Sequence, residues 1–225
     1  MNCDDWVTLL NALTQVVELL TRTNCSFVRM NFLAHAYLSF NHPQILVGNM
    51  ISDFVKGKYR LGLSGNISQG ITLHREIDGF TDDHPSTKKA KEIFRPHYRL
   101  YSGALLDVIY DYYLANDPRY FSDASLSVFA RETYQHLEDH SAYLPPNFLH
   151  AFTYMKAHNW LYHYRLKDGI RNSLRGLARR ASYISEGETA YQLFIEHEEV
   201  LKNHFEIFFP DVKQFAKQRF NELVL

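Results

Sequence analysis

Two pairs of polar side chains that could bind a metal ion lie one helical turn apart in otherwise apolar segments. His74 and Asp78 occur in ITLHREIDGFTDDH, and Asp107 and Asp111 occur in GALLDVIYDYYL. Because residues four apart lie on one face of a helix, each pair can present two ligands to a single ion. Ionised groups in apolar surroundings are costly unless a cation or a partner compensates them. The first hypothesis is therefore a metal centre between helices, and the alternative is that the aspartates cap neighbouring helices or pair with arginine.

Two more polar residues interrupt apolar segments upstream of these pairs. His35 lies inside NFLAHAYL, and Asp53 lies inside ILVGNMISDFVKG. His35 is compatible with ligation and equally with a structural hydrogen bond to a backbone carbonyl, whereas a short acid in such a segment needs compensation. A histidine nitrogen with several carboxylate oxygens is typical of Mg²⁺, Mn²⁺ or Fe²⁺ sites, since zinc more often recruits Cys or additional His. We expect Mn²⁺ or Mg²⁺, with Fe²⁺ as the alternative.

The composition is that of a globular protein without extensive disorder. Hydrophobic residues make up 46% and charged residues 22% of the 225 residues, and the formal net charge is -1. Bulk electrostatics therefore give no reason to expect a nucleic-acid partner. The two cysteines form no zinc or disulfide pattern. No apolar run is long enough to cross a bilayer and the N-terminus lacks a basic region, so we expect a cytoplasmic protein with no membrane partner.

Helical periodicity dominates the chain, because apolar residues recur at intervals of three and four. This pattern predicts an all-α, compact multi-helix bundle that forms one domain over residues 30–225. Residues 1–29 are expected to be an N-terminal extension, either a short amphipathic helix or an artefact of start-codon choice. The predicted helices lie near residues 31–40, 43–56, 65–81, 85–95, 97–116, 123–140, 146–164, 166–182, 187–208 and 210–223.

Prolines provide several of the expected helix boundaries. Pro43 and Pro85 follow polar residues and predict the first turns of two helices. Pro96 predicts the end of one helix, and Pro210 followed by Asp211 predicts the start of the last one. The short intervals between the predicted helices favour a compact arrangement over separate lobes.

Four ordered segments resemble the acyl carrier protein phosphodiesterase family. They are MNFLAHAYLS at 30–39, GNMISDFVKG at 48–57, ITLHREIDGFTDDHP at 71–85 and YSGALLDVIYDYYLA at 101–115, and the similarity extends over about 30–210. The resemblance implies an all-α fold related to the HD phosphohydrolases. It also implies a Mn²⁺- or Mg²⁺-dependent hydrolysis that releases 4'-phosphopantetheine from holo acyl carrier protein and leaves the apo form.

The motifs of the family assign roles to particular residues of this chain. Its DF-V-K/R-G aspartate matches Asp53, its HR-x-ID pair matches His74 and Asp78, and its D-x-x-x-D pair matches Asp107 and Asp111. Family members often have His directly after the second aspartate, where this chain has Tyr112, so that imidazole is absent here. The expected metal ligands are Asp53, His74, Asp78, Asp107 and His35.

Three further residues complete the hypothetical mechanism. Asp111 is expected to ligate or orient a water molecule whose pKa the ion lowers. Arg75 and Lys56 lie beside the ligand motifs and could contact the phosphate oxygens, although both are equally compatible with ordinary solvated charge. The expected chemistry is an in-line displacement at phosphorus.

Cationic helix faces are candidates for docking the acidic carrier protein. Arg171, Arg175 and Arg179 recur at intervals of four, so one face of their helix should be positive. A second basic cluster comprises Lys88, Lys89, Lys91 and Arg95. The alternative is that both are solvated helix faces.

Two other functions fit the same residues. One is an HD-like phosphohydrolase that acts on a nucleotide or another small phosphodiester. The other is a non-catalytic helical binding protein in which the acids and histidines are internal hydrogen-bonding groups. The sequence does not assign an oligomeric state.

Overall fold

The computed structural model describes residues 31–55, 62–63, 65–180 and 187–224, with the side chains of 178–180 and 187 left aside. Within these ranges all regular structure is helical and there is no strand, so the predicted all-α fold is confirmed. The predicted N-terminal extension, residues 1–29, lies outside the described residues. The expected relation to HD phosphohydrolases stays a prediction.

The helices follow the order of the predicted segments. They are α2 (Phe32–Tyr37), α3 (Pro43–Ile51), α4 (Gly65–Asp83), α5 (Pro85–Tyr98), α6 (Ser102–Asn116), α7 (Asp123–Asp139), α8 (Pro146–Ala157), α9 (Trp160–His163), α10 (Lys167–Arg180), α11 (Gly187–Glu196) and α12 (Glu198–Val224). Short 3₁₀ turns η1 (Ser52–Phe54), η3 (Arg99–Tyr101) and η4 (Ser141–Tyr143) lie between them.

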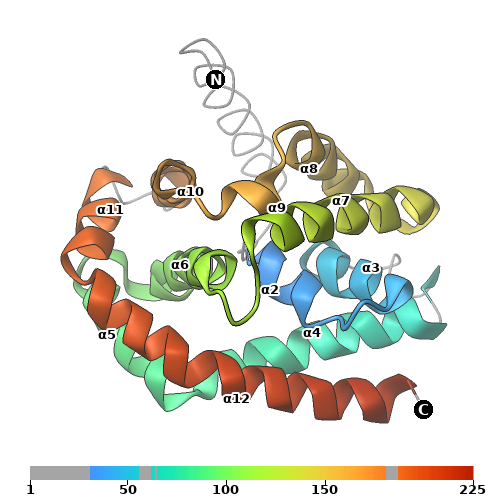
Figure 1. Cartoon of the computed structure of the whole chain (residues 1–225), viewed down its shortest axis with the longest axis horizontal. Helices are drawn as coiled ribbons and strands as arrows, with labels where there is room; N and C mark the ends of the chain where they lie inside the picture. The colour runs from blue at the N-terminus through green and yellow to red at the C-terminus, as the bar shows by residue number, and fades with distance from the viewer. Residues whose placement is uncertain (1–30, 56–61, 64, 181–186, 225) are drawn as a thin grey trace.

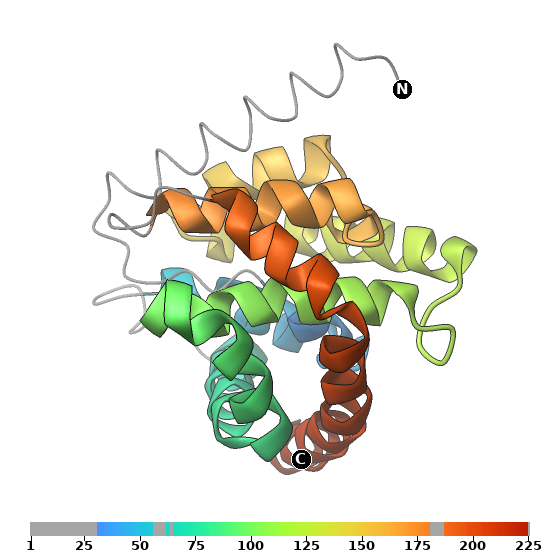
Figure 2. The ribbon, with the colours of Figure 1, turned by 90° about the vertical axis from the view of Figure 1, so that its left-hand side faces the viewer.

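The helices form three layers, which Figures 1 and 2 show from two directions. The long helix α12 lies with α4 and α5 on one side of the molecule, and the three helices pack on one another. The short helices α2 and α3 and the central helix α6 form the middle layer. Helices α7 to α10 cover the opposite side. The middle layer carries buried polar residues, among them His35, Asn49, Asp107 and Asp111.

Helix α6 is the most enclosed of the long helices. Its buried residues include not only the apolar stripe of Leu105, Val108 and Ile109 but also Asp107 and Asp111 on the other face. Both carboxylates interrupt an apolar segment of the sequence, and both are buried in the structure.

Helices α3 and α4 approach each other until their backbones touch, and two glycines make this possible. A Cβ atom at Gly48 would lie 2.0 Å from the Ile67 carbonyl oxygen, and one at Gly70 would lie 2.3 Å from the Ile45 carbonyl oxygen. No other residue type fits at either position without moving a helix, because the opposing atoms belong to the backbone. This contact brings the residue after Gly48 close to the middle of α4.

Two predicted boundaries at prolines are wrong. Pro96 lies inside α5, which continues to Tyr98, and Pro210 lies inside α12. The helix that was expected to end before Pro210 instead breaks at His197. A proline in a helix interior removes one hydrogen bond and costs about 3 kcal/mol. The buried side chains of Phe208, Phe209 and Val212 on either side of Pro210 favour continuation of α12.

The predicted helix over 146–164 is also interrupted. It divides into α8 and α9 at Asn159, which has a left-handed backbone with φ 46°. Asparagine tolerates this conformation better than most residues, so the chain can turn there without glycine.

Candidate metal centre

His35, His74 and Asp78 converge between α2 and α4. One ligand atom from each of the three lies within 4.8 Å of the others, and within the described ranges this is the only group of at least three His, Cys, Asp or Glu residues that close together. Nε2 of His35 lies 3.2 Å from Oδ1 of Asp78, and Nε2 of His74 lies 3.5 Å from Oδ2 of the same carboxylate. Asp53 in η1 joins from a third element, with Oδ1 3.4 Å from Nε2 of His74. Four of the five predicted ligands are therefore neighbours.

The two imidazole rings are stacked, with centroids 4.0 Å apart and an interplanar angle of 21°. Both side chains are buried, whereas those of Asp53 and Asp78 are 22% and 19% exposed. The carboxylates thus lie on the solvent side of the cluster, with the histidines behind them. A ligand from solution would meet the carboxylate side first.

Asn49 on α3 contacts both histidines on the side opposite the carboxylates, although its type and position in the sequence did not predict a site residue. Its Oδ1 lies 2.7 Å from Nδ1 of His35 and 3.2 Å from Nδ1 of His74. The only signal in the sequence was one amide in the apolar run ILVGNMIS, and a buried asparagine is ordinarily explained by backbone hydrogen bonds.

Among the described residues, the ring nitrogens on the other side have no hydrogen-bond partner of good geometry. Nε2 of His35 and Nε2 of His74 are both buried, and within the described ranges each has only carboxylate oxygens at ion-pair distance. A neutral imidazole that donates through Nδ1 presents a lone pair at Nε2. Two such lone pairs facing carboxylates repel them, and a divalent cation between the groups would turn that repulsion into ligation. The donor set therefore fits a metal ion.

Burial and neighbouring charge move the pKa values of the two histidines in opposite directions. Burial and the proximity of His74 lower the pKa of His35, and they outweigh the effect of Asp78. Burial alone would also lower the pKa of His74, but the contact with Asp53 and the charges of Asp78 and Asp53 raise it above the usual value. His35 is thus the ring that more readily stays neutral, as a metal ligand must be.

Asp111 has a different position from the one that the motif suggested. Its Oδ2 accepts a hydrogen bond from the Leu33 amide at 3.0 Å, and its Oδ1 accepts one from the Ala34 amide at 2.9 Å. These amides belong to the first turn of α2, where no carbonyl of the helix can accept from them. The N-cap residue of α2, Asn31, makes no side-chain hydrogen bond to them. Asp111 therefore caps α2 from another helix, and burial raises its pKa despite these two bonds. This was the alternative considered for the aspartates of α6.

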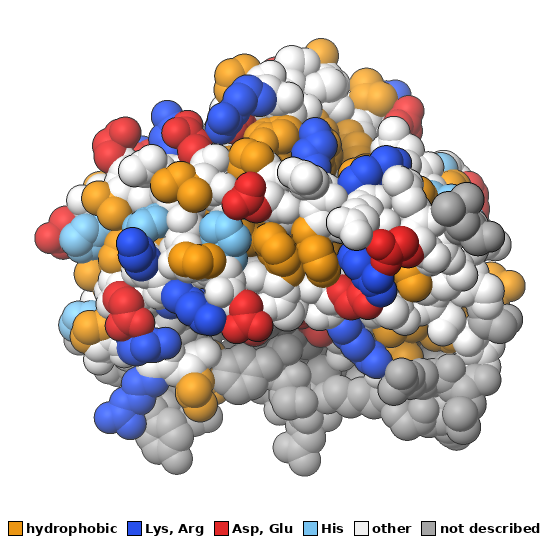
Figure 3. Space-filling model, turned by 90° about the horizontal axis from the view of Figure 1, so that it is seen from below, with side chains coloured by type: hydrophobic (Ala, Val, Ile, Leu, Met, Phe, Trp, Pro, Cys, Tyr) orange, Lys and Arg blue, Asp and Glu red, His pale blue; other side chains and the backbone are white. Residues whose placement is uncertain are grey.

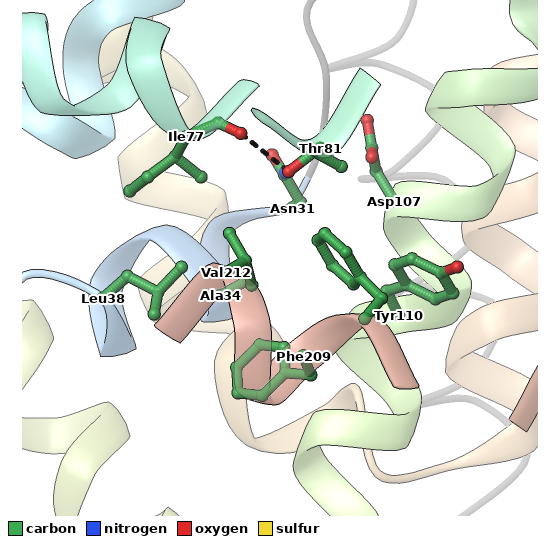
Figure 4. Close-up of a pocket in the computed structure, with 10 residues that line it drawn as sticks. Asn31, Ala34, Leu38, Ile77, Thr81, Asp107, Tyr110, Phe209 and Val212 are labelled. Atoms are coloured by element: carbon green, nitrogen blue, oxygen red, sulfur yellow. Dashed lines mark hydrogen bonds between the residues drawn. The ribbon is translucent and has the colours of Figure 1, made fainter. Parts of the chain in front are cut away.

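Asp107 lines a small cavity of about 20 Å³ between α2, α4, α6 and α12. Figure 4 shows Asp107, Asn31 and Thr81 on one side of the cavity and Leu38, Val212 and Phe209 on the other. A space of this size is sufficient for about one water molecule. Asp107 is not part of the close group formed by His35, His74 and Asp78.

The remaining predicted site residues lie in different surroundings. Arg75 is exposed on α4 beside His74, and no ion pair of its side chain is found among the described residues. Lys56 lies outside the described residues. Tyr112, which replaces the histidine often found in the family, packs its ring against Phe194 of α11 with centroids 5.6 Å apart. That position belongs to the packing of α6 on α11 and not to the histidine cluster.

The predicted docking arginines of α10 contact an acid of α11. Arg171 donates to Oε1 of Glu188 at 2.6 Å, and Nη2 of Arg175 lies 2.7 Å from Oε2. The side chain of Arg179 lies outside the described ones. In the second basic cluster, Lys88, Lys91 and Arg95 pair with Asp83, Asp82 and Glu92, respectively. Figure 3, which views the α4, α5 and α12 side, likewise shows acidic and basic side chains interspersed.

In the part of the chain that the structure describes, no helix combines the length and the hydropathy of a membrane span.

Comparison with known proteins gives a consistent result. A family model described as acyl carrier protein phosphodiesterase matches residues 30–212. A protein of that name from Enterobacter sp. (strain 638) is 32% identical over 191 residues, which cover 84% of this chain and 99% of the relative. Proteins of the same name from Photorhabdus laumondii and Escherichia coli are each 31% identical, and the match covers 96% and 99% of them, respectively. No solved structure matches the chain.

Proposed function

Because the chain belongs to the acyl carrier protein phosphodiesterase family, we propose that it hydrolyses the phosphodiester that joins 4'-phosphopantetheine to acyl carrier protein, with the help of a divalent cation. The observation that supports the metal dependence is the convergence of two buried Nε2 atoms on the carboxylates of Asp78 and Asp53. The carrier protein is the partner that the names of the relatives indicate.

His35, His74, Asp78 and Asp53 are the residues that would hold the ion. The carboxylate oxygens suit Mn²⁺ or Mg²⁺, and a set that includes two imidazole nitrogens also suits Fe²⁺, which is the alternative. A bound cation of this kind supplies charge neutralisation for a phosphate and activation of water.

Other residues of the chain would position the phosphate or bind a second ion. The two partly exposed carboxylates define the side from which a phosphate can approach. Arg75 follows His74 on α4, is exposed and has no ion pair among the described residues, so we assign it the role of donor to non-bridging phosphate oxygens. Asp107 stays a candidate for a second ion or for a bound water, because its carboxylate lines the adjacent cavity.

The test is incubation with holo acyl carrier protein and Mn²⁺, followed by mass spectrometry of the carrier. We expect a loss of the phosphopantetheine mass with the wild type and none after chelation. Asp78→Asn should reduce turnover by more than about 100-fold, because losing a ligand should exceed the effect of about 10–100-fold that is typical of outer-shell partners. Asp83→Asn is the matched control on the same helix, since Asp83 is 86% exposed and pairs only with Lys88 among the described residues. Full activity of the Asp78 variant would refute the metal role.

The rival hydrolase is distinguished by substrate. If cyclic or linear nucleotides were cleaved while holo carrier protein stayed intact, the fold and metal centre would stand and the substrate would change.

Docking through α10 remains part of the proposal. The two arginines share a single glutamate, so the pair of helices keeps a local excess of positive charge. Arg175→Glu should raise KM for the carrier protein and weaken the salt dependence of the reaction, whereas unchanged kinetics would place the docking surface elsewhere.

A further inference from the structure

Asn49 is a fully buried residue at the meeting point of three helices. It belongs to α3, its Oδ1 contacts histidines of α2 and α4, and none of its side chain is exposed to solvent. It can reach α4 because its neighbour Gly48 lets the two backbones touch.

The orientation of the amide follows from its other partners. Nδ2 lies 2.9 Å from the His35 carbonyl oxygen, which can only accept a hydrogen bond. Nδ2 also donates to Oγ of Ser39 at 3.0 Å, and that hydroxyl donates to the same carbonyl at 2.8 Å. The nitrogen must therefore be on this side, and Oδ1 must face the two rings.

An amide oxygen can only accept, so each Nδ1 that contacts it has to carry a proton. The oxygen has two lone pairs, one for each ring. When the rings are neutral, both Nε2 atoms are then deprotonated and direct their lone pairs toward Asp78 and Asp53. Without this acceptor, an imidazole is free to adopt the opposite tautomer, which places a hydrogen on the atom that must ligate the metal.

We propose that Asn49 is a positioning residue that holds both histidines in the Nδ1–H tautomer through one oxygen atom and so prepares both metal-binding nitrogens at once. This inference rests on the proposed function, because it assigns a purpose to the centre that the metal-dependent reaction requires. It extends that function, because the position of the proton on both imidazoles then depends on Asn49, a residue that does not bind the metal. Outer-shell partners of this kind typically account for about 10–100-fold in metal affinity.

The first experiment reads the tautomers directly in the metal-free protein. With ¹⁵N-labelled histidine, the imidazole nitrogen shifts of His35 and His74 are recorded at a pH where both rings are neutral. We expect a protonated Nδ1 and an unprotonated Nε2 for both rings in the wild type. If either neutral ring carried its proton at Nε2, the proposal would be overturned, whether or not any variant folds.

Three variants separate the acceptor from the rest of the amide. Asn49→Leu removes the acceptor and should release the tautomers and weaken Mn²⁺ binding, measured by calorimetry, by about 10–100-fold. Asn49→Asp keeps an acceptor for both rings and should restore the tautomers. Ser39→Ala removes the hydroxyl that accepts from Nδ2 and donates to the His35 carbonyl oxygen, but it leaves Oδ1 in place. It should leave both tautomers and Mn²⁺ binding unchanged.

The outcomes distinguish the two proposals. Wild-type affinity for Mn²⁺ in a folded Asn49→Leu protein would refute the positioning role while leaving the metal centre intact. Absence of Mn²⁺ binding by the wild type would refute the metal-dependent function, and the ¹⁵N shifts would still decide the role of Asn49.

Discussion

Replacing Gly70 with alanine should push α3 away from α4 and disturb the histidine cluster without changing any residue that contacts it. The new Cβ would lie 2.3 Å from the Ile45 carbonyl oxygen and 3.0 Å from the backbone nitrogen of Asn49. Ordinary contact at such an atom begins at 3.4 Å, so the helices would have to separate locally by about 1 Å. The clash cannot be relieved by a side-chain rotation, because both opposing atoms belong to the backbone.

Two effects of known size follow from this separation. Overpacking of this kind costs about 1–3 kcal/mol in the free energy of unfolding. The contact between Oδ1 of Asn49 and Nδ1 of His74 is 3.2 Å long, so about 1 Å more would exceed the length at which a hydrogen bond persists. We therefore expect lower stability together with weaker Mn²⁺ binding, measured by urea denaturation and calorimetry.

Gly79→Ala on the same helix is the matched control. A Cβ at Gly79 meets nothing within 4 Å, so the helix propensity of alanine should stabilise the protein by about 0.5–1 kcal/mol. The two glycine variants should thus change stability in opposite directions. If Gly70→Ala were as stabilising as Gly79→Ala, the close helix contact would be refuted.

Three further substitutions have expected outcomes. Asp111→Asn can accept only one of the two amide bonds at the start of α2 and should cost about 1–3 kcal/mol in urea denaturation; unchanged stability with lost turnover would instead support a direct catalytic role. The bond with Arg171 lowers the pKa of Glu188. The small stabilisation from this exposed pair should therefore be complete above the ordinary carboxyl pKa of about 4.3 and be lost as the pH falls through the lowered value. The stability difference between wild type and Glu188→Gln, measured against pH, should vanish in acid; a constant difference would contradict this linkage. Tyr112→His should not strengthen Mn²⁺ binding, because Tyr112 packs on Phe194, and it should lose about 0.5–1.5 kcal/mol of aromatic contact; a gain in affinity would contradict the structure.

The all-α fold and part of the histidine cluster could be predicted from the sequence because both depend on helical spacing. Helical spacing fixes which residues share a face, so the pairing of His74 with Asp78 could be predicted from an interval of four. That Asp53 and His35 would join them was an inference from polar residues in apolar surroundings, and the structure brings both to His74.

The surroundings of a residue could not be predicted from the sequence where a distant element provides them. Asp107 and Asp111 have the same spacing as His74 and Asp78, yet Asp111 bonds to amides 77 and 78 positions away in the chain. Asn49 was visible in the sequence only as one amide in an apolar run, because its importance arises from two rings that only the packing of three helices brings together. The continuation of α12 through Pro210 likewise depends on buried contacts that outweigh the local rule.

The cap that Asp111 provides for α2 also has a consequence for the order of folding. A helix of six residues has too few internal bonds to persist alone, since isolated helices shorter than about 12–15 residues are marginal in water. The segment that carries His35 should therefore stay unstructured until α6 has docked, and the ligand set would be completed late, by a long-range contact. A peptide that spans only the first three motifs carries His35, Asp53, His74 and Asp78 but lacks α6, and should consequently be unable to assemble the centre.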